Sequence, residues 1–253
     1  MGKQKEVILL IVEGQNDEDL LTEYIEEEFA EAGDKTYRFE VTNGDILSRP
    51  SNNLETNPVK EVNDVLNKFM KEKKFRIGDI AHIFQVIDVD GILASSDTYQ
   101  VREQLTSNHE YDLVNNKIYF RTQNILNVTS RIWENKLRLV NRLAKTNKIR
   151  NRKYKLLYFS VTSEHVIANQ IYWQQDDKFN AIDAFQDQYP DLSSLRSFLK
   201  KENLVYQTND IQESWAKLLA EEKLIRKTNI NLLFDEIEKI LLKDKNGENN
   251  ETN

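Results

Sequence analysis

The amino-acid sequence predicts an α/β fold: a parallel sheet of about four strands flanked by helices, with a helical insertion and a helical C-terminal region. The first observation behind this prediction is a pair of continuous apolar runs, VILLIV at 7–12 and IAHIFQVI at 80–87. Strands buried on both faces lack polar alternation, as these runs do. The second observation is that stretches with helical periodicity alternate with the runs, which favours parallel pairing through right-handed crossovers.

The first part of the chain reads as strand, helix, strand, helix, strand. The expected elements are, in order, a strand at 7–12, a helix capped by Asn16 and ended by Gly33, a strand at 37–42, a helix starting near Pro58, and a strand ending at Asp88. Further elements expected later are a buried strand at about 155–162 (KLLYFSVT) and helices over 211–225 and 231–242.

These elements divide the chain into four parts. The expected parts are an α/β core formed by 1–91 and 153–175, a mainly helical and basic insertion at 92–152, a helical C-terminal region at 176–243, and a disordered tail at 244–253.

The composition excludes several kinds of site. The 253 residues contain no cysteine, which removes disulfides, thiolate nucleophiles and cysteine-bound zinc. The three histidines, His82, His109 and His165, lack the spacing of a zinc site, whereas oxygen ligands for a hard cation are plentiful. No apolar stretch approaches the roughly 20 residues that span a bilayer, and no small-residue cleavage site follows the first run. We therefore expect a cytoplasmic protein without membrane contact.

Acidic residues follow both buried runs. Glu13-Gly14 comes after the first run, while Asp88 and Asp90, which share one side of an extended chain, end the second. Because the carboxyl ends of parallel strands meet at one edge of the sheet, we expect Glu13, Asp88 and Asp90 to converge in one cleft. Such carboxylates suit Mg²⁺, with Mn²⁺ as an alternative, and the helix start after Glu13 favours a phosphate. The sequence therefore predicts metal-assisted phosphoryl transfer, with Glu13 as a ligand or as a general acid or base.

The segments VILLIVEGQNDEDLL and VIDVDG together resemble the Toprim domain, in which a Glu-Gly pair after the first strand and an Asp-x-Asp after a later strand form a magnesium site. The resemblance covers roughly 7–91 and, less fully, the strand near 155–161. It implies that Glu13, Asp88 and Asp90 are the catalytic and metal-binding residues. The chain is most similar to the small Toprim nucleases of phage defence, which implies an abortive-infection effector that cleaves RNA or DNA.

Two features depart from the usual Toprim pattern. Gly91 follows the Asp-x-Asp directly, and the stretch before the next strand is longer than a minimal Toprim domain needs. Toprim proteins of defence systems often carry a polar motif after that strand, and FSVTSEHVIAN is similar to it. Glu164 is therefore a candidate additional metal ligand, with capping of the next helix by Glu164 and His165 as the alternative. Asp17 is interpreted as a first-turn residue that complements the helix dipole.

The segment from Arg131 to Lys155 is strongly basic, although the chain as a whole has a net charge of −7. It contains ten Lys or Arg residues and the single acid Glu134. An excess of positive charge with interleaved aromatic residues is typical of nucleic-acid contact, while an ordinary solvated helical face is the alternative. The candidate nucleic-acid-binding residues are Arg138, Arg142, Lys145 and Arg150.

Two other functions stay open. One is a housekeeping RNA-processing Toprim ribonuclease, and the other is a non-catalytic Toprim module that acts as a sensor or scaffold for a partner ATPase. The sequence contains no Gly-x-x-x-x-Gly-Lys phosphate loop, so that ATPase would be another chain. Formation of a homo-oligomer is left open as well.

Overall fold

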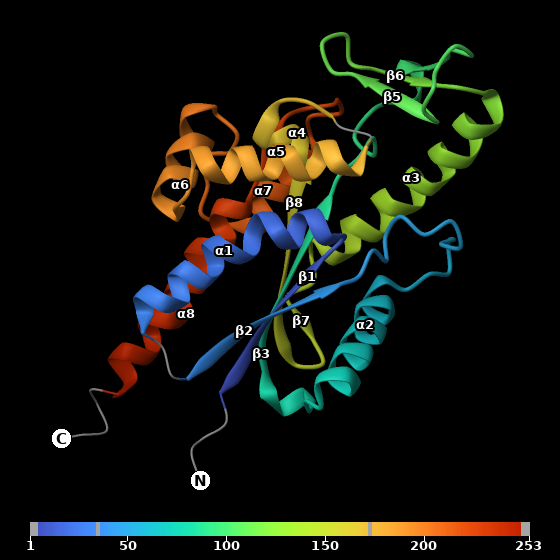
Figure 1. The fold of residues 1–253 in the computed structure, drawn as a ribbon. Helices are drawn as coiled ribbons and strands as arrows, with labels where there is room; N and C mark the ends of the chain where they lie inside the picture. The colour runs from blue at the N-terminus through green and yellow to red at the C-terminus, as the bar shows by residue number, and fades with distance from the viewer. Residues whose placement is uncertain (1–4, 34–35, 172–173, 249–253) are drawn as a thin grey trace.

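The computed structural model describes residues 5–33, 36–171 and 174–248, and within them a six-stranded mixed sheet forms the centre of the protein (Figure 1). The four parallel strands, in the order β2-β1-β3-β8, are β1 (Glu6–Val12), β2 (Tyr37–Asn43), β3 (Ile80–Asp88) and β8 (Arg152–Ser160). Two short antiparallel strands, β7 (Lys148–Ile149) and β9 (Lys227–Thr228), pair with the other edge of β8. The predicted α/β class and its parallel strands are confirmed.

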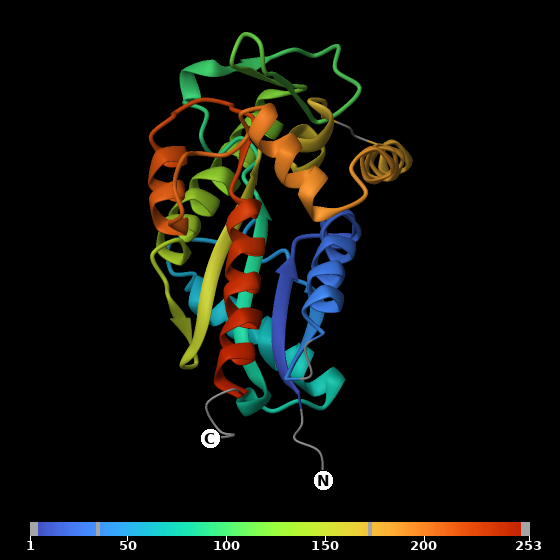
Figure 2. The same cartoon turned by 90° about the vertical axis from the view of Figure 1, so that its left-hand side faces the viewer.

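Helices cover both faces of this sheet, which explains why its central strand β1 is apolar after its first residue. Side chains at 7–12 are at most 1% exposed. On one face lie α1 (Gln15–Ala32) and α8 (Ile230–Glu248), and on the other lie α2 (Pro58–Lys73) and α3 (Gln123–Leu143) (Figures 1 and 2). Tyr24 of α1 meets Phe234 of α8 edge to face, with ring centroids 6.4 Å apart, and this contact holds the first pair together.

The two ends of α1 differ in how well the sequence predicts them. Gly33 ends the helix in the left-handed conformation, with φ of 60°, as expected of a glycine at this position. Asn16 is not the cap, because Gly14 occupies that position in an extended conformation. The Asn16 side chain instead donates a hydrogen bond to Glu164 Oε1 over 3.1 Å. The start of α1 is thereby tied to the segment that follows β8.

The insertion at 92–152 is not mainly helical, because its first half forms a second sheet. This small sheet has the order β4-β6-β5, with β4 (Tyr99–Val101), β5 (His109–Asp112) and β6 (Lys117–Phe120). Both views show it beyond the end of the main sheet at which β1, β3 and β8 finish (Figures 1 and 2). Ile118 and Phe120 are fully buried on its inner face, where Phe120 packs on Trp133 of α3. The insertion therefore covers the carboxyl ends of the parallel strands.

Gly91 occupies a position that has no space for a side chain. A Cβ atom there would lie 2.5 Å from Cη2 and Cζ3 of Trp133 and 2.9 Å from Cδ1 of Ile118. We expect Gly91→Ala to lower the free energy of unfolding by about 1–3 kcal/mol, the usual cost of overpacking a core. Urea denaturation measures this, with Gly78→Ala as the control because nothing lies within 4 Å of a Cβ at Gly78. Equal stability of the two variants would contradict the expected clash.

The C-terminal region is helical, as predicted, but its boundaries differ from those expected. Its helices besides α8 are α5 (Gln175–Gln188), α6 (Leu192–Lys201) and α7 (Ile211–Leu219), and α4 (Ser163–Ala168) precedes them in the core. Two short 3₁₀ turns lie earlier in the chain, at Ile77–Asp79 and Ser96–Thr98. The helix expected over 211–225 ends at Leu219. The tail predicted to be disordered is helical over 244–248, where α8 continues, and 249–253 lie outside the described residues. None of the described helices combines the length and apolar character of a bilayer crossing.

Candidate metal centre

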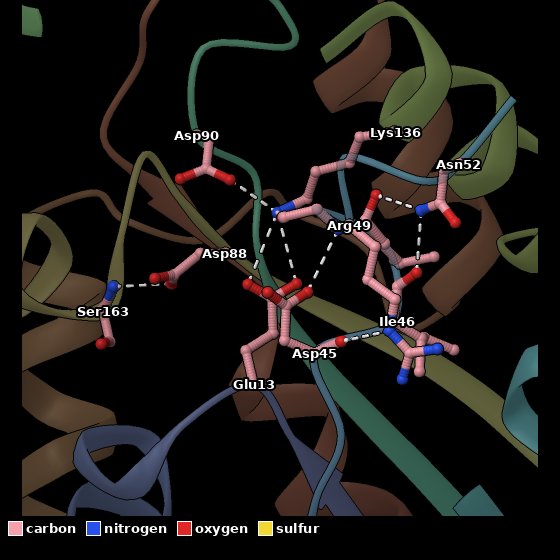
Figure 3. Close-up of polar contacts among 11 residues, drawn as sticks. Glu13, Asp45, Ile46, Arg49, Asn52, Asp88, Asp90, Lys136 and Ser163 are labelled. Carbon is pink, nitrogen blue, oxygen red and sulfur yellow. Dashed lines mark hydrogen bonds and ion pairs between the residues drawn. The ribbon is translucent and has the colours of Figure 1, made fainter. Parts of the chain in front are cut away.

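The three carboxylates singled out in the sequence lie at one edge of the parallel sheet. Glu13 directly follows β1, and Asp88 is the last residue of the neighbouring strand β3. Asp90 comes two residues later with a φ of 53°, a left-handed conformation that turns the chain after the strand and that Asp tolerates better than most residues. Figure 3 shows Glu13 and Asp90 on either side of the Lys136 ammonium, with Asp88 nearby.

The backbone between β3 and β8 fixes the position of Asp88. The β3–β8 ladder continues past the strand end, because the Asp90 amide donates to the Val161 carbonyl over 2.8 Å. At the start of α4 the Ser163 amide donates to Asp88 Oδ1 over 3.0 Å. This hydrogen bond to a helix N-terminal amide holds the carboxylate at the same edge as Glu13.

Lys136 of α3 is the residue of this centre that the sequence analysis missed. Its side chain is 0% exposed, and its Nζ lies 2.6 Å from Asp90 Oδ2, 3.3 Å from Glu13 Oε1 and 2.9 Å from Ser48 Oγ. Burial acts to lower the pKa of the Lys136 ammonium, but attraction to Asp90 and Glu13 outweighs burial and raises the pKa above its ordinary value. A buried positive charge therefore bridges two of the three predicted carboxylates.

A second acidic group adjoins the first and includes Asp17, which lies in the first turn of α1 as the sequence predicts but is buried. Asp17 in the first turn of α1 is 4% exposed, and Glu164 in the first turn of α4 is 2% exposed. Glu164 Oε1 forms an ion pair with Lys178 Nζ at 3.0 Å, whereas Oε2 is buried and has no hydrogen-bond partner among the described residues. Asp88 joins the two groups, because it ends β3 beside β1 and accepts the hydrogen bond from Ser163 at the start of α4.

The pKa values of these carboxyl groups report an excess of buried negative charge. Burial raises the pKa of Glu13 to about 8, although Lys136 partly opposes the rise. Burial likewise raises the pKa of Asp17 to about 6 and that of Asp88 well above its usual range, and repulsion among the carboxylates adds to these shifts. A cation held among these groups would relieve this repulsion.

The raised pKa of Glu13 leads to a pH dependence of stability. Between its ordinary pKa of 4.5 and the folded value of about 8, the folded chain keeps a proton that the unfolded chain has lost. We therefore expect the free energy of unfolding of metal-free protein to fall as the pH rises from 6.5 to 8. Below pH 6.5 the lowered pKa of buried His165, about 4, acts in the opposite direction. Urea denaturation in EDTA measures the slope.

The control for this pH dependence is Glu13→Gln, which cannot titrate. The variant should show a flatter dependence than the wild-type protein between pH 6.5 and 8. A wild-type stability that rises over the same interval would contradict the assigned shift.

The carboxylate oxygens are hard donors of the kind that Mg²⁺ and Mn²⁺ prefer, so the chemistry of the donor set fits such an ion. The unpartnered Glu164 Oε2 is a further donor within the second group. In the described part of the chain, however, no three acidic or histidine side chains are placed closely enough to hold a metal together. The Lys136 ammonium takes the cation's place between Glu13 and Asp90.

The segment after β8 also settles which residue caps α4. The cap is Thr162, whose Oγ1 accepts a hydrogen bond from the His165 amide over 3.2 Å. Neither Glu164 nor His165 caps the helix. His165 Nδ1 accepts a hydrogen bond from the Val161 amide over 3.1 Å, which makes His165 a buried structural residue. Glu164 remains available to the acidic group.

The four predicted nucleic-acid-binding residues do not gather around the carboxylates. Arg138 donates hydrogen bonds to the backbone carbonyls of Asn53 and Thr56. Arg150 lies in the turn before β8, at the opposite end of that strand, and donates to Asn67 Oδ1 of α2 over 2.7 Å. The other two, Arg142 and Lys145, are exposed at the end of α3. Two of the four thus hold the fold together.

Searches against protein-family models, curated proteins and solved structures found no match to this chain.

Proposed function

We propose that the chain is a Mg²⁺-dependent Toprim-type nuclease that hydrolyses phosphodiester bonds in RNA or DNA. The observation that supports this proposal most is that a positive charge already occupies the space between Glu13 and Asp90. This charge is the buried Lys136 ammonium, and a third carboxylate, Asp88, lies beside it. A phosphodiester carries negative charge, so hydrolysis near these carboxylates requires compensating positive charge. The further role of antiphage effector rests on the Toprim resemblance.

In this proposal Glu13, Asp88 and Asp90 would hold the metal, with Glu164 as a further ligand. A bound divalent metal stabilises charge on the phosphoryl group and lowers the pKa of a bound water. Glu13, with a pKa near 8, can take or give a proton at neutral pH.

Three further groups at this edge of the sheet would position the phosphate and the carboxylates. Lys136 supplies a positive charge for a phosphate oxygen, and the Ser163 amide keeps Asp88 in place. The N-terminus of α1, directly after Glu13, favours an anion at this edge of the sheet.

The direct experiment is incubation of the purified protein with labelled tRNA, single-stranded DNA and plasmid, each with Mg²⁺, Mn²⁺ or EDTA. Cleavage of at least one substrate with a metal and none with EDTA is the expected result. Absence of cleavage under all conditions would remove the nuclease proposal.

A non-catalytic module is the second candidate, and Lys136 is the observation that favours it. Its ammonium, fully buried and 2.6 Å from Asp90, supplies a permanent internal counter-charge that could make a metal unnecessary. In that case calorimetry would detect no Mg²⁺ binding although the protein is folded, and a partner such as an ATPase would carry the activity. If the nuclease does act, growth arrest on expression separates an abortive-infection effector from a housekeeping ribonuclease.

A further inference from the structure

A groove of about 480 Å³ lies between the edge strand β5 and the chain that follows α4. Arg102, Tyr111 and Tyr119 line it from the small sheet, and Gln170 and Ile171 line it from the other side. Its volume is in the range of pockets that bind small molecules or parts of larger ones, roughly 300–1,000 Å³. None of the carboxylates of the metal centre lines this groove.

The side of the groove formed by the small sheet carries a stacked pair, Arg102 on Tyr119. The guanidinium carbon of Arg102 lies 3.5 Å from the centroid of the Tyr119 ring, so the charged plane rests on the aromatic face. Arg102 is exposed and lines the groove, so its guanidinium is accessible to a ligand there. Arginine planes and aromatic rings are the surfaces on which proteins stack unpaired nucleobases.

Tyr111 connects this groove with the metal centre. It lines the groove, and its ring stacks on Trp133, whose own ring packs against Gly91, the residue that follows Asp90. The ring is held from behind, because Tyr111 Oη lies 3.3 Å from His109 Nε2 and the ring stacks on Trp133 at 6.2 Å between centroids. A ligand in the groove would therefore lie beside the centre rather than on a separate face of the protein.

The charge of the groove favours a base over a phosphate. Among the described residues that line it, Arg102 is cationic, and Glu110 and Asp112 are acidic. Their charges would repel a phosphate, whereas carboxylate oxygens accept hydrogen bonds from the amino groups of bases. Both oxygens of Asp112 accept hydrogen bonds from Asn115, whereas Glu110 Oε1 accepts only a long one, 3.5 Å from Ser107 Oγ, so Glu110 keeps more acceptor capacity. The chemistry of the walls thus fits a stacked base that carries an amino group.

We propose that this groove receives one unpaired nucleobase of a single-stranded nucleic acid, stacked on Arg102, while an adjacent phosphodiester reaches Glu13, Asp88 and Asp90. The proposal rests on the proposed nuclease function and narrows it: the substrate is single-stranded or locally unpaired, because a base held in a duplex cannot enter the groove.

The test measures binding apart from cleavage. All variants carry Asp88→Asn, and fluorescence anisotropy follows their binding to a labelled single strand of about twelve nucleotides, a length within the usual range of such sites. Arg102→Ala should weaken binding about 5- to 150-fold, the usual loss when one base loses its stacking partner. Arg102→Lys, which keeps the charge and loses the plane, should weaken binding to a similar extent.

The matched control is a series of labelled strands in which the base is removed from one nucleotide at a time. When single nucleotides of the strand are made abasic in turn, one position should remove most of the difference between Arg102→Ala and its parent. A blunt duplex should bind weakly and show no effect of Arg102. Wild-type-like binding by Arg102→Lys would instead indicate a phosphate contact and overturn the proposal, as would an abasic series that has no effect at any position.

The outcomes also separate this inference from the nuclease proposal. If binding depends on the planar guanidinium of Arg102 but the protein cleaves no substrate, the nucleobase-binding groove is supported and the nuclease function is rejected. If the wild-type protein cleaves its substrate but single-strand binding does not depend on Arg102, the nuclease function is supported and the nucleobase-binding groove is rejected.

Discussion

Asp88→Asn is expected to reduce metal-dependent cleavage by more than about 100-fold, since loss of even an indirect partner of a metal ligand costs 10- to 100-fold. The amide has nearly the shape of the carboxylate and keeps an oxygen for the Ser163 amide, so the local fold should survive. What disappears is the negative charge that both acidic groups share. Initial cleavage rates under saturating Mg²⁺ measure the effect.

The control for this substitution is Asp64→Asn, which makes the same chemical change on the exposed side of α2. Its cleavage rate should equal that of the wild-type protein. The stability of metal-free Asp88→Asn should be unchanged or higher, because the raised pKa of Asp88 shows that its charged form is unfavourable in the fold. Retained cleavage by a folded Asp88→Asn protein would remove Asp88 from the metal centre.

Lys136→Met is expected to have the largest effect on stability. The substitution keeps most of the buried volume but removes the ammonium that lies between Asp90 and Glu13. Removing one partner of a buried ion pair leaves an uncompensated charge and costs about 3–5 kcal/mol. The loss should be larger at pH 8 than at pH 6, because the Glu13 carboxyl, with a pKa of about 8, is protonated at the lower pH. Urea denaturation in EDTA measures it.

Added Mg²⁺ or Mn²⁺ should restore much of the stability that Lys136→Met loses, since a divalent ion would replace the missing positive charge. The control is Lys68→Met on α2, where the lysine is 78% exposed and the change should stay within about 0.5 kcal/mol. A Lys136→Met protein that is as stable as the wild type without metal, or that gains nothing from metal, would contradict the assigned role.

The positions of Glu13 and Asp88 could be predicted because each follows an apolar run without polar interruption. Such a run fixes both a buried strand and the place where the strand ends. The parallel pairing of β1 with β3 then brings the two residues to one edge of the sheet. The small sheet could not be found in this way, because its strands have only three or four residues, many of them polar.

Lys136 was missed because its contact with Asp90 joins residues 46 positions apart. A local signal does exist, however. Lys136 falls in line with Trp133, Val140 and Leu143 on the buried side of α3, and a lysine within such a stripe needs a buried partner. Asp17 lies in the first turn of α1 as predicted, but its burial could not be foreseen, since only the pairing of β3 with β8 brings α4 and Glu164 to it.

The basic segment shows why a count of charges does not locate a surface. Its positive residues are concentrated in one stretch of sequence but spread along α3 and around the turn before β8. One of them, Lys136, turns inward to the carboxylates, and two others, Arg138 and Arg150, hold neighbouring loops and helices. What remains for a solvent-exposed partner is smaller than the sequence indicates.

Diffraction from crystals soaked in Mn²⁺, recorded at a wavelength where manganese scatters anomalously, examines the carboxylate edge most directly. We expect an anomalous peak in contact with oxygens of Glu13, Asp88 and Asp90, with the Lys136 ammonium displaced from Asp90. Absence of any peak at this edge under saturating Mn²⁺, with Lys136 still paired to Asp90, would show that these carboxylates do not form a metal centre.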